Sequence, residues 1–117
     1  MNEINKSFLE VKKSKFYGYI YNINSVEDVD NIISYLKKDN KKAKHIIYAY
    51  KLNNIERLYS DKEPNGTTRG LLDVINKNNM NNTLIVVIRY FGGILLGSGP
   101  LTRTYTKVSA MLIKKEL

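Results

Sequence analysis

The sequence predicts an α/β (α+β) fold, a two-layer sandwich with a mixed β-sheet and helices on one of its faces. Three observations support this prediction. Apolar residues alternate with tyrosines over residues 16–21, with the period of two that a strand requires. Apolar residues then recur at helical spacing over residues 26–36. Finally, the mostly β-branched run 84–88 leads into a glycine-rich loop and an amphipathic helix.

The N-terminal third is predicted to form two strands and a helix. Residues 8–23 divide into two antiparallel strands, because polar residues at 12–14 interrupt the alternation. Ser25, followed three residues later by Asp28, resembles a capping box and begins a helix over residues 26–39. Val26, Val29, Ile33 and Leu36 follow the cap at helical spacing.

The middle of the chain is predicted to form a hairpin and a second helix. Residues 45–50 and 56–60 are rich in strand-forming side chains, and the asparagines at 53–54 supply the turn between them. Thr67 or Thr68 is expected to cap the next helix, which ends in the asparagine-rich segment that follows. Its expected buried residues are Leu71, Leu72 and Ile75.

The C-terminal third is predicted to form a buried strand, a glycine loop and a helix. The run 84–88 is typical of a central strand that is covered on both faces or deeply buried on one. Pro100 suits the first turn of the final helix, because the amide that it lacks has no intrahelical partner there. The inner face of this helix is expected to contain Leu101, Tyr105, Val108 and Leu112.

The composition indicates one domain over residues 1–117, which buries about 65% of its unfolded surface without a stabilising metal or disulfide. The lack of cysteine excludes disulfide scaffolds, zinc ribbons and a thiol nucleophile. Because His45 is the only histidine, we expect no metal site, and we expect no cofactor. No apolar run approaches the ~20 residues that span a bilayer, and the first residues do not resemble a signal peptide. We therefore expect a cytoplasmic protein without membrane contact.

The charge favours a polyanionic partner such as RNA. There are 19 Lys and Arg residues against 11 Asp and Glu residues, a net charge of +8. Lysine and arginine release condensed counterions when they bind phosphates. The alternative is that the excess of lysine and asparagine reflects an AT-rich genome. Only residues 37–51 are locally dense in lysine.

The glycine-rich segment 89–105 is the first candidate site. The amides of such a loop and the positive end of the following helix can hold a phosphate. Two nucleotide-binding motifs are excluded, because Ser98 stands where a P-loop needs lysine and Thr102 where a dinucleotide loop needs glycine. The alternative is that the glycines only permit positive φ angles and close packing. The candidate anion-binding or nucleic-acid-binding residues are Arg89, Gly92, Gly93, Gly97, Ser98, Gly99, Arg103 and Lys107.

The charged side chains near this loop leave alternatives open. Arg89 and Arg103 can hold phosphate or carboxylate in a bidentate fork, or Arg89 can form an internal ion pair with Asp61 or Glu63. The two carboxylates could act as acid and base in a small phosphate-binding hydrolase, or cap amides and pair with arginine. We expect His45 to be a structural hydrogen-bonding residue, and we assign no catalytic residue.

Tyrosines provide a second candidate surface. Tyr17, Tyr19 and Tyr21 share one face of a predicted strand, and Tyr48 and Tyr50 share a face of another. Aromatic rings on a sheet can stack on unpaired bases. The alternative is that tyrosine simply covers a half-buried sheet, which it does well.

Four segments together resemble the N-terminal domain of the YigZ/IMPACT family. They are KSKFYGYI (13–20), AKHIIYAY (43–50), SDKEPNGTT (60–68) and VIRYFGGILLGSGPLTRTYT (87–106), of which the last is the most specific. The resemblance places the family's characteristic residues at His45, Tyr48, Ala49, Asp61, Glu63, Pro64, Gly66, Thr67, Arg89, Tyr90, Phe91, Gly92, Gly93, Gly97, Gly99, Arg103 and Tyr105.

The resemblance implies a fold like domain IV of elongation factor G and domain 2 of the ribosomal protein uS5, with a left-handed crossover. It also implies a role in translation, with association to RNA or the ribosome as the usual suggestion for bacterial members. The family motif around residues 60–70 differs here, because one residue is missing between Asp61 and Glu63, Asn65 replaces serine and Arg69 precedes Gly70. The later motif differs as well, since it has proline instead of glycine at position 100.

From these observations we expect a binding module of translation rather than an enzyme. Its partner would be RNA or a ribosome-bound molecule, reached through the glycine loop and the arginines. The alternative is a protein-interaction module in translational or stress regulation. The chain ends at Leu117, so the ferredoxin-like C-terminal domain of bacterial members is not expected. The chain is therefore either a single-domain member or a shortened one.

Overall fold

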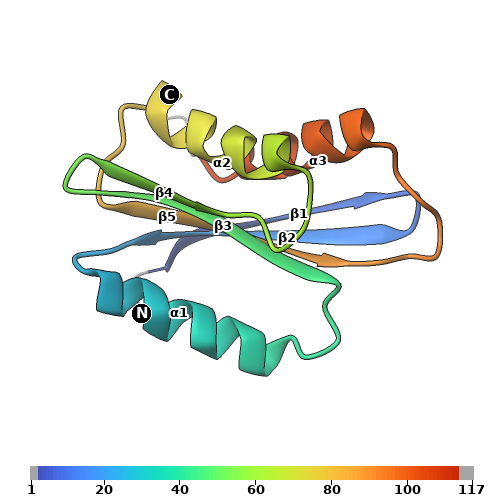
Figure 1. Cartoon of the computed structure of the whole chain (residues 1–117), viewed down its shortest axis with the longest axis horizontal. Coiled ribbons are helices and arrows are strands. Elements are labelled where there is room, and N and C mark those ends of the chain that lie inside the picture. The colour runs from blue at the N-terminus through green and yellow to red at the C-terminus, as the bar shows by residue number, and fades with distance from the viewer. Residues whose placement is uncertain (1–2, 114–117) are drawn as a thin grey trace.

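The computed structural model describes residues 3–113 and contains five strands and three helices in the predicted order (Figure 1). The α+β class is therefore confirmed. No helix in this part of the chain combines the length and apolarity needed to cross a membrane. The elements are β1 (Glu3–Val11), β2 (Ser14–Asn22), α1 (Val26–Asp39), β3 (His45–Leu52), β4 (Ile55–Tyr59), α2 (Asn65–Lys77), β5 (Thr83–Tyr90) and α3 (Ser98–Ala110).

The sheet is antiparallel throughout, with strand order β1-β2-β5-β3-β4. The prediction of a mixed sheet is therefore wrong. The strands β2 and β3 run in the same direction, but they never pair because β5 lies between them and is antiparallel to both. The last strand in the chain is thus the central strand of the sheet.

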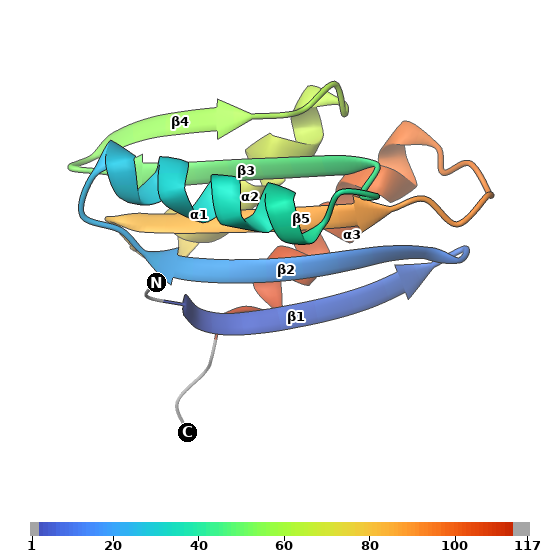
Figure 2. The ribbon, with the colours of Figure 1, turned by 90° about the horizontal axis from the view of Figure 1, so that it is seen from below.

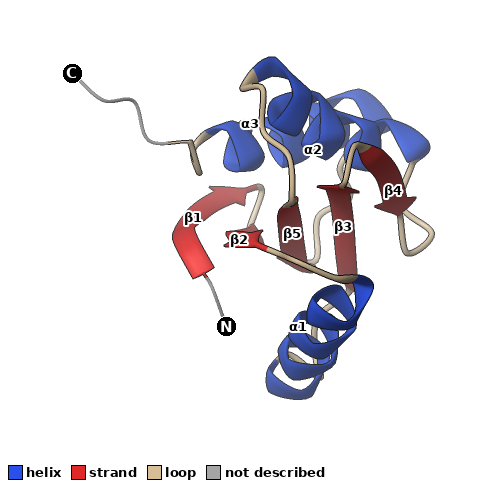
Figure 3. Cartoon of the chain, turned by 90° about the vertical axis from the view of Figure 1, so that its left-hand side faces the viewer, coloured by secondary structure: helices blue, strands red, loops and turns tan. Residues whose placement is uncertain are grey.

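Helices cover both faces of the sheet, so the predicted two-layer sandwich with helices on one face is also wrong (Figures 1 and 3). The helix α1 packs over one face, and α2 and α3 pack over the other. The physical reason is β5, whose residues 84–88 are all fully buried. Alternate residues of this run point to opposite faces, and each face therefore needs its own apolar cover.

The two crossover connections have opposite hands. The β2–α1–β3 connection passes over β5, and the β4–α2–β5 connection passes over β3 on the opposite face. The two connections run in opposite directions across the sheet and begin from oppositely directed strands. Reversing both the strand direction and the direction across the sheet leaves the hand of a crossover unchanged, whereas moving the connection to the opposite face reverses it. One of the two connections must therefore be left-handed. Figure 2 shows that it is β4–α2–β5, an exception to the nearly general right-handed rule.

The helix starts are partly as predicted. The Ser25 hydroxyl accepts a hydrogen bond from the Asp28 amide at 3.1 Å, and α1 has the predicted bounds. By contrast, α2 begins at Asn65, before the two threonines, so neither Thr67 nor Thr68 is its cap. Their hydroxyls instead donate to the backbone carbonyls of Pro64 and Asn65. Asn65 and Gly66, which precede the threonines, are already helical. The N-cap residue is Pro64, whose ψ of 140° lies outside the helical range.

The glycine loop is fixed to the β1–β2 turn at one point. The Gly92 amide donates a hydrogen bond to the Ser14 hydroxyl at 3.1 Å. A Cβ atom at Gly92 would lie 2.1 Å from the carbonyl carbon and oxygen of Lys13, and both are backbone atoms. Glycine is therefore required here for close approach of the two backbones.

We predict that Gly92→Ala lowers the free energy of unfolding by about 1–3 kcal/mol, because the added methyl group forces the loop away from the turn. The matched control is Gly99→Ala in α3, where the nearest atom to a new Cβ is the flexible end of Arg103. This control should leave stability unchanged or raise it by up to about 1 kcal/mol. Urea denaturation measures both, and equal stabilities of the two variants would contradict the prediction.

Candidate functional site

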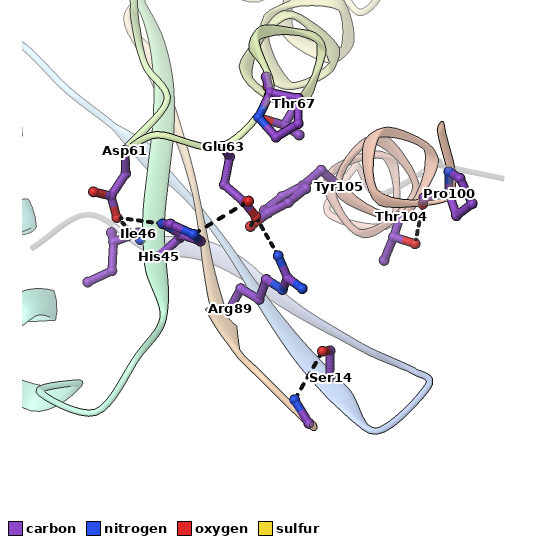
Figure 4. A network of polar contacts seen from close by, with 12 residues as sticks. Ser14, His45, Ile46, Asp61, Glu63, Thr67, Arg89, Pro100, Thr104 and Tyr105 are labelled. Carbon is purple, nitrogen blue, oxygen red and sulfur yellow. Dashed lines mark hydrogen bonds and ion pairs between the residues drawn. The ribbon is translucent and has the colours of Figure 1, made fainter. Parts of the chain in front are cut away.

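The family-motif residues His45, Asp61, Glu63, Arg89 and Tyr105 form one polar cluster on the face of the sheet covered by α2 and α3 (Figure 4). The cluster joins four parts of the chain: β3, the β4–α2 loop, β5 and α3. From the sequence, an ion pair of Arg89 with Asp61 or Glu63 was one alternative, whereas His45 and Tyr105 were not connected to it. The structure brings them together because β3 pairs with β5 and places His45 opposite Arg89.

The centre of the cluster is the carboxylate of Glu63. Its Oε2 atom accepts hydrogen bonds from Arg89 Nη1 at 2.9 Å and from the Tyr105 hydroxyl at 2.5 Å. Glu63 and Arg89 are only 7% and 6% exposed, so the ion pair is buried. Burying either charge alone would cost several kcal/mol, and each charge therefore depends on the other.

Arg89 is consequently not placed to bind an external anion. Its guanidinium faces Glu63 and lies between two aromatic rings, 5.7 Å from the centre of Phe16 and 5.9 Å from that of Phe91. The internal ion pair, one of the two alternatives from the sequence, is the one observed. The physical reason is burial, because an unpaired guanidinium at this position would be desolvated without compensation.

His45 bridges the two carboxylates of the β4–α2 loop. Its Nε2 lies 3.5 Å from Glu63 Oε1, and its Nδ1 lies 3.4 Å from Asp61 Oδ2. The second contact is within ion-pair distance, but Nδ1 is buried and makes no hydrogen bond with good geometry. Asp61 instead accepts a hydrogen bond from the Ile46 amide at 2.9 Å. The carboxylate thus holds the β4–α2 loop to the beginning of β3.

This arrangement favours a structural role for the cluster over acid–base chemistry. Both carboxylates proposed as acid and base already accept hydrogen bonds from groups within the protein. In residues 3–113, no group of three or more His, Asp or Glu side chains is arranged to hold a metal ion. The hydrolase alternative therefore receives no support from the geometry of Asp61 and Glu63.

The remaining motif residues of the loop pack the starts of the two helices. Pro64 is the N-cap of α2 and Thr67 is fully buried. A Cβ atom at Gly66 would lie 3.3 Å from the Thr102 side chain of α3. Close approach of α2 and α3 therefore requires a small residue at position 66.

The glycine loop, residues 91–97, connects β5 to α3, and some of the predicted anion-binding residues lie close together where α3 begins. Gly97 is the N-cap of α3, and Ser98 and Gly99 form its first turn without a side-chain cap. The guanidinium of Arg103 lies over that turn, near Gly99, and is exposed. Gly92 and Gly93 lie at the other end of the loop, where Gly93 has a φ of 91°. Lys107 is exposed one turn further along α3 than Arg103.

Lysines gather at the end of the sheet where β5 stops. Strand pairing places the β1–β2 turn, the α1–β3 loop and the β4–α2 loop at this same end (Figure 2). We call this surface the lysine end, and its members, all exposed, are Lys12, Lys13, Lys15, Lys41, Lys42, Lys44 and Lys62. In the sequence, only the lysines within 37–51 stand out as a dense group. Those at 12–15 and 62 join them through strand register, which the sequence does not display.

Comparison with known proteins agrees with these observations. The family model described as the Impact N-terminal domain matches residues 12–113. The chain belongs to this family. It is 32% identical over 111 residues to the IMPACT family member YvyE of Bacillus subtilis (strain 168), covering 92% of this chain. The Impact N-terminal domain described here spans 51% of that relative's length, about half.

Two solved structures have the same fold as this Impact N-terminal domain. One, described as a hypothetical protein, has a TM-score of 0.86 at 24% identity and covers 96% of this chain and 60% of its own. The other is the two-domain translational regulator Yih1, with a TM-score of 0.51 at 20% identity. That alignment covers 92% of this chain and 43% of Yih1. At these identities the two structures establish the fold alone.

We predict that Arg89→Met lowers the free energy of unfolding by about 3–5 kcal/mol, because it leaves the Glu63 carboxylate buried without its cation. The double variant Arg89→Met with Glu63→Met should lose less, since both charges are removed together. Urea denaturation measures each cost. The exposed Arg57→Met is the control and should change stability by no more than about 0.5 kcal/mol. A single variant as stable as this control would contradict the role given to the ion pair.

We also predict that stability falls above about pH 10. Burial raises the pKa of the Tyr105 hydroxyl above its ordinary value, and the hydrogen bond to Glu63 raises it further. The unfolded chain therefore loses this proton first as pH rises, and unfolding becomes more favourable by up to about 1.4 kcal/mol per pH unit. Urea denaturation between pH 8 and pH 11 should show a shallower decline for Tyr105→Phe. The exposed Tyr35→Phe should keep the wild-type decline, and identical profiles for both variants would contradict this account.

Proposed function

We propose that this chain is a non-enzymatic binding module of translation regulation, which contacts RNA or a ribosome-bound partner through the lysine end. The observation that carries the proposal is the gathering of seven exposed lysines on one end of the molecule. Membership of the Impact N-terminal domain family supports the connection to translation, since the structurally similar Yih1 is described as a translational regulator.

The charge of the lysine end is available to a partner. Two carboxylates close to it, Asp61 and Glu63, are already occupied by the Ile46 amide, Arg89 and Tyr105. They compete little with an external phosphate for the lysines. Arg103 adds a guanidinium over the uncapped first turn of α3, where helix amides favour an anion. Such contacts position a nucleic-acid backbone without reading its sequence.

Arg89 has an indirect role in this proposal. Its contact with the Phe91 ring connects the buried ion pair to the first residue of the glycine loop. We therefore regard Arg89 as a positioning residue for that loop. This differs from the expectation that Arg89 itself contacts the partner.

The proposal predicts salt-sensitive binding to RNA and ribosomes. Affinity should fall steeply as salt rises, and Lys41→Gln with Lys42→Gln should reduce the slope of log affinity against log salt by about one to two. Arg103→Ala should reduce it by about one. Fluorescence anisotropy with labelled RNA and ribosome co-sedimentation, each at several salt concentrations, provide the measurements.

The matched control for the lysine pair is Lys6→Gln with Lys77→Gln, which removes the same charge away from the lysine end. It should retain the wild-type slope apart from a small effect of net charge. An equal loss in both double variants would show that only total charge matters. Failure of the wild-type protein to bind RNA or ribosomes at low salt would overturn the proposal.

A protein-interaction module is the second candidate, and the outer strand β4 favours it. All five residues of β4 are exposed, and its apolar side chains Ile55, Leu58 and Tyr59 remain partly uncovered. An edge strand of this kind offers unpaired backbone groups to a partner strand. Ribosome association that persists at high salt and is lost in Leu58→Asp, but not in the Lys41 and Lys42 variant, would support this alternative.

A further inference from the structure

A hollow of about 540 Å³ lies on the α1 face of the sheet, beside the lysine end. The helix α1 covers the centre of this face, and β2 is left partly open beside the helix C-terminus. We call the hollow the tyrosine groove. Its lining residues are Lys13, Lys15, Tyr17, Tyr19, Asn40, Tyr90 and Phe91.

The aromatic rings of the tyrosine groove are held in place before any ligand arrives. The Tyr90 hydroxyl donates a hydrogen bond to Asn40 Oδ1 at 2.5 Å. Tyr17 packs edge-to-face against Tyr90, with ring centres 5.9 Å apart, and its other neighbour is the ring of Phe8 at 5.0 Å. A rigid aromatic surface loses little conformational entropy when a flat ligand stacks on it. Phe91, a further aromatic residue of the lining, is 44% exposed.

The charge of the groove is suited to a phosphate at one end only. Lys13 and Lys15 line it beside the aromatic rings, and no carboxylate is among its lining residues. A second hollow of about 350 Å³ shares Tyr19 and Asn40 with it, but two carboxylates, Glu3 and Asp39, line that one against a single cation, Lys6. An anionic ligand would therefore occupy the end near the β1–β2 turn and stop before the acidic part.

We infer that the tyrosine groove binds an unpaired nucleotide of single-stranded RNA, with its base on the aromatic rings and its phosphate on Lys13 and Lys15. This inference rests on the proposed function, because the neighbouring lysine end supplies the attraction for the rest of the strand. The required ligand combines a flat ring with an adjacent negative charge. A paired base cannot expose its face to a ring in this way, so duplex RNA should not use the groove.

The test compares a fluorescein-labelled oligoadenylate with an RNA duplex of similar length by anisotropy at low salt. Tyr17→Leu and Phe91→Leu should each weaken oligoadenylate binding about tenfold, because each removes a stacking surface for a base. Duplex binding should change little. The control is Tyr59→Leu on β4, a residue that is 42% exposed, much like Phe91, but lies outside the groove.

A measurement on the wild-type protein covers the case in which Tyr17→Leu does not fold. Titration of oligoadenylate should shift amide resonances of residues 16–19 and 90–91 in a ¹H–¹⁵N spectrum, whereas the duplex should shift mainly those of 12–15, 41–44 and 62. Shifts at 16–19 and 90–91 with an acidic peptide, but not with oligoadenylate, would assign the groove to a protein partner and overturn the inference.

Two further outcomes separate this inference from the proposed function. The first outcome is that duplex and single-stranded RNA bind with equal affinity and that Tyr17→Leu and Phe91→Leu have the same affinity as the Tyr59→Leu control. This result would overturn the inference about the groove, but it would leave RNA binding through the lysine end in place. If no RNA binds at low salt, RNA recognition by both surfaces is excluded. A single-stranded DNA of the same base composition that binds as tightly as oligoadenylate would show that the groove does not select RNA, which would overturn the assignment to RNA.

Discussion

The buried ion pair between Glu63 and Arg89 is the interaction on which the positions of several other parts depend. It connects the β4–α2 loop to the central strand, and the same carboxylate accepts the hydroxyl of Tyr105 from α3. His45 contributes from the neighbouring strand. The charges would be costly in isolation, so the elements that bear them must assemble in one arrangement. The polar cluster therefore selects among packings of an otherwise apolar interior.

Arginine and lysine have different positions in this fold, because Arg89 is buried whereas the lysines of the lysine end are exposed. Arg89 holds a carboxylate with a planar fork, which suits a guanidinium. The exposed charge at the lysine end comes from lysines of β2 and of three loops, which the strand register brings to one end. The buried ion pair and the exposed positive charge of the lysine end therefore use different residues. Phe91 is adjacent to both groups, since its ring centre lies 5.9 Å from the Arg89 guanidinium and the residue also lines the tyrosine groove.

Local structure was largely predictable from the sequence, whereas tertiary arrangement was not. The bounds of α1 follow from its capping box and apolar spacing, both of which are local signals. The start of α2 was missed because Pro64 provides no side-chain cap. The apolar run of β5 is compatible with helices on both faces of the sheet. The run does not indicate, however, that α1 covers one face and that α2 and α3 cover the other. Likewise, Lys15 lies opposite Tyr90 only through a pairing between distant segments.

The central position of β5 has a consequence for the order in which the chain can assemble. The hairpins β1–β2 and β3–β4 each pair neighbouring segments, and both can form while the chain is still being synthesised. Neither hairpin touches the other in the sheet until residues 83–90 enter between them. Until then each presents an open inner edge, and strands with open edges are prone to pair with other chains. A nascent chain halted before β5 would therefore be the form most in need of a chaperone.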